Sequence, residues 1–140
     1  MKKITLLFLV QTVFSFAQDF KTPYEKGNGN QTTTYEEMVK FYDDLDKNFE
    51  SISVVEKGKD DNGELIRVVI FDNSKKQNIP VILINNGIHP GESDGIDATM
   101  MLIRDLALGK IKVPQNTKVA AIEAYNISGM QRRGKFSRAN

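Results

Sequence analysis

Apolar side chains recur at helical spacing in two stretches of the chain. The first stretch forms one apolar stripe, made of Met38, Phe41, Tyr42, Leu45 and Phe49. Thr34 and Glu37, three residues apart, have the pattern of a capping box and mark the start of this helix. The second stretch, residues 94–108, is followed by Gly109, a residue typical of the position just after a helix end. Both stripes predict helices that pack on a core.

Between these helices the apolar pattern shortens to lengths typical of strands. Residues 51–55 and 65–71 are rich in β-branched side chains and flank a turn that contains Asn62-Gly63. An Asn-Gly pair between two such runs is the strongest short-range signal of a β-hairpin. The sequence therefore predicts an antiparallel hairpin after the first helix.

A second group of elements follows the hairpin. Residues 80–84 are continuously apolar, which predicts a strand buried on both faces. The predicted helix 94–108 comes next, and residues 118–125 form another apolar strand. A strand, a helix and a strand in this order predict a parallel βαβ unit with a right-handed crossover. The predicted fold class is therefore α/β, with a mixed sheet in which a hairpin precedes a parallel βαβ unit.

The N-terminal segment differs from the rest of the chain. Lys2 and Lys3 precede the apolar run 4–10, and Ser15-Phe16-Ala17 is a small-x-small site. This order is typical of a cleaved secretory signal peptide, which we place at residues 1–17. The alternative is a membrane anchor, but the run is shorter than the roughly 20 apolar residues that span a bilayer. We expect a secreted or periplasmic protein without a stable membrane anchor after cleavage.

Composition and charge narrow the choice of partners. The chain has 140 residues, with 19 basic against 18 acidic side chains and a net charge of +1. This balance gives no support to nucleic acid as a partner. The chain has no cysteine, so its stability depends on its core and not on disulfides. Residues 18–33 are polar and are expected to form an arm, and residues 34–140 are expected to form one domain.

The segment 85–93 carries the candidate chemistry. His89 and Glu92 lie three residues apart, between the apolar strand and the following helix, with Pro90-Gly91 between them. An imidazole nitrogen and a carboxylate oxygen are common zinc ligands. Ligands of open α/β sheets bind outside the carboxyl ends of the strands, where this segment falls. The alternative is a surface histidine beside a glutamate that interacts with the dipole of the helix start.

Residues 82–92, Ile-Leu-Ile-Asn-Asn-Gly-Ile-His-Pro-Gly-Glu, resemble the first metal-binding motif of the zinc carboxypeptidases of the carboxypeptidase A type. Residues 125–129, Tyr-Asn-Ile-Ser-Gly, resemble the Asn-Pro-Asp-Gly segment that ends the next strand in that family, with Ile127 and Ser128 as departures. The resemblance implies an incomplete phosphorylase/hydrolase-like zinc-peptidase fold. It also implies one Zn²⁺ ion, with His89 and Glu92 as two of its ligands.

The resemblance further implies what this chain leaves out. The third zinc ligand of the family is a histidine farther along, but His89 is the only histidine of this chain. The general-base glutamate and the carboxylate-binding Asn-Arg pair of the family also come later. Residues 34–140 are therefore expected to be the N-terminal part of a carboxypeptidase domain, inactive by itself. The whole enzyme would cleave peptide bonds at the C-terminus of a peptide or protein.

Two other functions remain open at this stage. A zinc amidohydrolase of the aspartoacylase or succinylglutamate desuccinylase type also uses a His-x-x-Glu motif, and a secreted binding module would have no activity. Several other charged side chains are interpreted without any role in binding. Arg132, Arg133 and Arg138 are expected to form a solvated surface. Asp94 and Asp97 are acids of a first helical turn, which the helix dipole favours without any metal.

Overall fold

The computed structural model describes residues 19–132 and residue 134. The signal peptide predicted at residues 1–17 lies outside the described residues, as do Arg133 and Arg138. Within the part of the chain that is described, no helix is long and apolar enough to cross a membrane.

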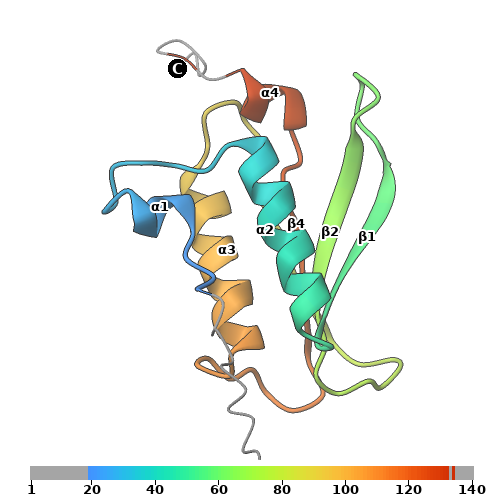
Figure 1. The fold of residues 1–140 in the computed structure, drawn as a ribbon. Coiled ribbons are helices and arrows are strands. Elements are labelled where there is room, and N and C mark those ends of the chain that lie inside the picture. The colour runs from blue at the N-terminus through green and yellow to red at the C-terminus, as the bar shows by residue number, and fades with distance from the viewer. Residues whose placement is uncertain (1–18, 133, 135–140) are drawn as a thin grey trace, which may run out of the picture.

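Two long helices match the stripes of the sequence. Helix α2 (Tyr35–Asn48) begins with the expected capping box, in which the Thr34 side chain accepts from the Glu37 amide. Helix α3 (Asp94–Ala107) ends one residue before the predicted limit, and Gly109 takes a left-handed conformation with φ of 70°. Both helices lie on the same side of the sheet (Figure 1).

The polar arm is more structured than its composition indicates. Helix α1 (Pro23–Lys26) interrupts it and has its own capping box between Thr22 and Glu25. Arg104 of α3 is 7% exposed and holds this helix in place, because its guanidinium pairs with Glu25 and donates to the Phe20 carbonyl at 3.2 Å. The arm therefore packs on α3.

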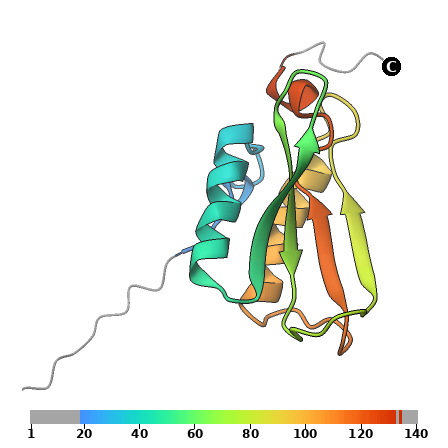
Figure 2. The ribbon, with the colours of Figure 1, turned by 90° about the vertical axis from the view of Figure 1, so that its right-hand side faces the viewer.

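Within residues 19–132, the sheet has four strands in the order β1-β2-β4-β3: β1 (Ile52–Lys59), β2 (Leu65–Phe71), β3 (Val81–Asn85) and β4 (Lys118–Ile122). β1 and β2 form the predicted antiparallel hairpin, and β4 is antiparallel to β2. β3 and β4 are parallel and are joined by α3, as predicted. Figure 2 shows the hairpin in front of α3, with the parallel pair beside it. The fold class predicted from the sequence is confirmed.

One core holds these layers together. It lies between the helices and one face of the sheet, and its fully buried members include Met38, Tyr42, Leu45, Val69, Met100 and Ile103. The predicted α2 stripe supplies four buried residues, and Phe49 is only partly buried. Burial of such side chains stabilises the fold by about 1.5–3 kcal/mol each.

The prediction that the strand at 80–84 is buried on both faces is wrong for this structure. Among the described residues, β3 lies at the edge of the sheet with β4 as its neighbour, and Val81, Ile82 and Leu83 are 55%, 49% and 64% exposed. Leu83 lies beside Ala120 in the register of β3 and β4. Both are on the face of the sheet that α2 and α3 do not cover. An apolar run predicts a strand, but it carries no information on what lies beyond the outer edge.

A buried acid lies at the end of β4. Glu123 is 1% exposed, and its Oε2 accepts from Arg67 at 3.0 Å. Its Oε1 and the Tyr42 hydroxyl are buried without a hydrogen-bond partner among the described residues. Burial raises the pKa of Glu123 from an ordinary value of 4.5 to about 7, although Arg67 acts in the opposite direction.

This pKa predicts a pH-dependent stability. The folded state holds the Glu123 proton more tightly than the unfolded chain, so the free energy of unfolding decreases as pH rises from 4.5 to about 7. The decrease amounts to about 3 kcal/mol at most. In Glu123→Gln we expect a smaller difference in melting temperature between about pH 5 and about pH 8. If Glu123→Gln and the unmodified protein show the same difference in melting temperature between these pH values, the raised pKa of Glu123 would be contradicted.

Candidate metal centre

The carboxyl ends of β3 and β4 are joined by backbone and side-chain hydrogen bonds. The amides of Tyr125 and Asn126 donate to the carbonyls of Asn86 and Gly87, each at 2.9 Å. The Asn86 side chain is buried, donates to the Ile122 carbonyl and accepts from the Thr99 hydroxyl of α3 at 3.1 Å. This network fixes the chain where it leaves both strands. The residues of the candidate site come directly after Asn86 and Gly87 in the sequence.

Two glycines permit this close approach. Gly87 has φ of 58°, and a Cβ there would lie 3.1 Å from the Ile96 side chain. At Gly129, a Cβ would lie 2.7 Å from Oδ1 of Asn126, which caps α4 (Ile127–Gln131) by accepting from the Gly129 amide at 2.8 Å. The Asn-x-x-Gly part of the second motif therefore has a local structural role.

His89 and Glu92 converge across the turn between β3 and α3. Nδ1 of His89 lies 3.0 Å from Oε1 of Glu92, and the His89 amide donates to Oε2 at 3.2 Å. Gly91, between them, has φ of 77°. The side chain of His89 is 55% exposed and that of Glu92 is 29% exposed. Glu92 directly precedes Ser93, the N-cap of α3. Its carboxylate accepts from the His89 amide and does not cap the helix.

This geometry fits a metal ion with a small adjustment. Two ligands at about 2.1 Å from a zinc ion, at a tetrahedral angle, are about 3.4 Å apart. The observed separation of 3.0 Å between Nδ1 and Oε1 is close to that value. The two groups supply one nitrogen and one carboxylate, which zinc accepts. Among residues 19–132 and 134, however, no group of three His, Cys, Asp or Glu side chains is placed to hold a metal.

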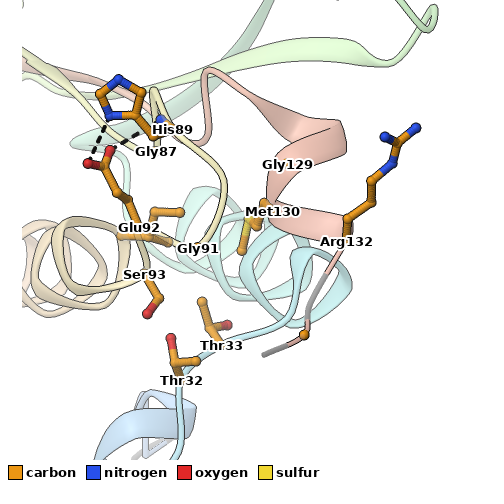
Figure 3. Close-up of a pocket in the computed structure, with 12 residues that line it drawn as sticks. Thr32, Thr33, Gly87, His89, Gly91, Glu92, Ser93, Gly129, Met130 and Arg132 are labelled. Atoms are coloured by element: carbon orange, nitrogen blue, oxygen red, sulfur yellow. Dashed lines mark hydrogen bonds and ion pairs between the residues drawn. The ribbon is translucent and has the colours of Figure 1, made fainter. Parts of the chain in front are cut away.

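The pair borders a small pocket of about 190 Å³. One wall is the β3–α3 turn, from Gly87 to Ser93, and another is α4, which contributes Gly129 and Met130. The third wall is formed by Thr32 and Thr33 of the arm (Figure 3). Ile96 of α3 is 1% exposed and forms part of the lining.

The structure separates the sequence-based candidates. It brings His89 and Glu92 together, as their spacing indicates. Arg132 is exposed at the rim, and its guanidinium points away from the pair in Figure 3. Asp94 is exposed, in line with its interpretation as a first-turn acid, whereas Asp97 is only 4% exposed and contacts the arm. The roles of Thr32 and Thr33 have no counterpart in any motif of the sequence.

Comparisons with known proteins agree on the fold. No family model and no curated protein sequence matches the chain. Solved structures do match. Bovine thrombin-activatable fibrinolysis inhibitor, solved in complex with a tick carboxypeptidase inhibitor, matches with a TM-score of 0.65 at 16% identity. Carboxypeptidase A from Helicoverpa armigera matches with 0.62 at 24% identity, and a metallo-carboxypeptidase from Burkholderia cenocepacia with 0.59 at 19%.

These matches cover most of this chain and a minor part of the others. They span 77%, 69% and 69% of the chain, but 36%, 25% and 27% of the three neighbours. The chain therefore has the metallocarboxypeptidase fold over the matched residues, and these residues correspond to 25–36% of the length of the three neighbours. At these identities the comparison establishes the fold, and the chemistry has to be argued from the site.

Proposed function

We propose that this chain is the N-terminal part of a secreted or periplasmic zinc carboxypeptidase, and we refer to the proposed longer polypeptide as the full-length protein. In it, His89 and Glu92 are two ligands of one catalytic Zn²⁺ ion. The third ligand and the general base lie beyond residue 140. Its substrates are peptides or proteins, cleaved at their C-termini.

One observation carries this proposal. Nδ1 of His89 and Oε1 of Glu92 lie 3.0 Å apart at the carboxyl end of a parallel strand, beside a pocket, in a fold shared with metallocarboxypeptidases. A catalytic zinc site has three protein ligands and one open position. Two ligands from this chain and one from elsewhere satisfy that requirement. The coverage of 25–36% of the neighbours is consistent with a longer polypeptide.

The chain's own residues have defined tasks in this mechanism. A bound zinc ion would polarise the scissile carbonyl and lower the pKa of a water molecule. His89 and Glu92, which line the pocket, would hold the ion, and the buried Asn86 fixes the start of the turn that carries them. Thr32, Thr33 and Met130 line the pocket beside His89 and Glu92, where they would limit the shape of a bound substrate.

The experiment is a substrate comparison with the full-length protein. We expect release of C-terminal amino acids from blocked peptides, loss of this activity with a chelator, and its recovery with zinc. N-acetyl-aspartate and N-succinyl-glutamate serve as matched amide substrates. Turnover of these amides alone would instead support the amidohydrolase. A protein that binds no zinc and cleaves neither class would be the non-catalytic binding module.

A further inference from the structure

One carboxylate of α3 binds both residues of the pocket wall formed by Thr32 and Thr33. The Thr33 amide donates to Oδ1 of Asp97 at 3.0 Å, and the Thr32 hydroxyl donates to Oδ2 of the same side chain. These contacts join residues 64 and 65 positions apart in the sequence. Asp97 is 4% exposed, and its own amide donates to the Ser93 carbonyl at 2.9 Å. Asp97 therefore ties the arm to the first turn of the helix that follows Glu92.

Residues 31–33, which include the two threonines that Asp97 binds, have no regular secondary structure, although Thr33 is buried. Asn28 and Gly29 take left-handed conformations, with φ of 51° and 79°. The Asn30 amide donates to the Gly27 carbonyl within the arm, and the Thr33 hydroxyl donates to the carbonyl of Thr34, the N-cap of α2. Helix α2, by contrast, is fixed by its buried stripe. Loss of the Asp97 contacts is therefore expected to loosen the stretch around Thr32 and Thr33, while Arg104 still holds α1 and the core stays intact.

A second cavity lies on the other side of this wall. It measures about 420 Å³ and is lined by Tyr24, Asn30, Asp94 and Met101, among others. Thr32 and Ser93 line both this cavity and the 190 Å³ pocket beside His89 and Glu92. Thr32 and Ser93 thus lie between a small space and a larger one.

We propose that Asp97 is a positioning residue, which holds Thr32 and Thr33 as a specificity-determining wall of the pocket beside His89 and Glu92. With the wall in place, a bound substrate fits a narrow pocket. Without it, the pocket merges with the neighbouring cavity and its binding contacts weaken. The part that concerns substrate rests on the proposed function, whereas the anchoring of the arm does not depend on metal or activity.

The anchor is tested by amide hydrogen exchange on the chain described here. In Asp97→Ala we expect the Thr33 amide to exchange at least about tenfold faster. The variant removes the acceptor of this amide, so no hydrogen bond to Asp97 has to break before exchange. The matched control is Asp94→Ala, since both acids belong to the first turn of α3 and it is Asp97 that accepts the hydrogen bonds from Thr32 and Thr33. In the control we expect a change within about twofold. An unchanged Thr33 rate in Asp97→Ala, or equal acceleration in both variants, would overturn the anchor.

Two milder variants guard against misfolding. Thr32→Val keeps the side-chain shape but removes the hydroxyl that donates to Asp97. Asp97→Asn keeps one carbonyl oxygen as an acceptor. We expect both to accelerate exchange at Thr33 by less than Asp97→Ala does, while amides of the core strands exchange at the unmodified rate. No acceleration in either variant would contradict the proposal.

The wall itself is tested by kinetics of the full-length protein. For Asp97→Ala we expect a KM about tenfold higher, with kcat within about twofold and unchanged zinc content, because the variant loses uniform binding and no ligand. A fall in kcat together with zinc loss would refute a role confined to the wall, as would an unchanged KM. If the unmodified full-length protein lacks peptidase activity, the proposed function fails, and the exchange rates alone decide the anchor.

Discussion

Replacing His89 or Glu92 by alanine in the full-length protein is expected to remove most of the bound zinc and nearly all peptidase activity, while the fold survives. A catalytic zinc with three protein ligands loses a donor directly in either variant. Even changes at residues that only support the ligands cost about 10–100-fold in affinity or activity. Both side chains are partly exposed and lie outside the core, so the melting temperature is expected to change little.

The measurement combines elemental analysis, turnover and thermal melting for both variants. Asp94→Ala is the matched control, because Asp94 is an exposed acid two residues beyond Glu92. If Glu92 only interacts with the helix start, Glu92→Ala would cost about 0.3–1 kcal/mol of stability and leave activity intact. Full zinc occupancy with near-normal turnover in either variant would exclude that residue as a ligand.

The 140-residue chain by itself is expected to show no peptidase turnover and to bind zinc at least about a hundredfold more weakly than the full-length protein. His89 is its only histidine, and it has no cysteine. In the described part of the chain, no three potential ligand side chains come together. Two donors leave a zinc ion under-coordinated and exposed to solvent, so it dissociates readily.

Calorimetric zinc titration and a carboxypeptidase assay of the chain measure both effects. The His89→Ala form of the same chain is the control, since it keeps only one of the two donors. Chelator-sensitive turnover by the unmodified chain would mean that its own residues complete the site. In that case, the placement of the third ligand beyond residue 140 would be wrong.

The parts of the fold that local chemistry specifies are predictable from the sequence. The capping box of Thr34 and Glu37 sets the start of α2, and Gly63, with φ of 85°, lies in the turn of residues 60–64 that joins β1 and β2. The His89–Glu92 pair is predictable for the same reason. A three-residue offset across a turn brings both side chains together, with no distant contact required.

Features that depend on distant segments are not predictable in this way. The arm reaches the pocket because buried groups of α3 bind it, and neither Asp97 nor Arg104 signals this in its local sequence. Asp97, like Asp94, is an acid of the first turn of α3, and only the tertiary structure distinguishes the two residues. The exposure of Leu83 likewise depends on what flanks β3 in the sheet.

The most direct test of the zinc assignment is anomalous diffraction at the zinc absorption edge, from crystals of the full-length protein. We expect one strong peak within about 2.0–2.2 Å of both Nδ1 of His89 and a carboxylate oxygen of Glu92. A third protein ligand from beyond residue 140 should lie at a similar distance. A zinc peak at another place, with His89 and Glu92 still paired to each other and without metal, would contradict the claim that these residues are zinc ligands.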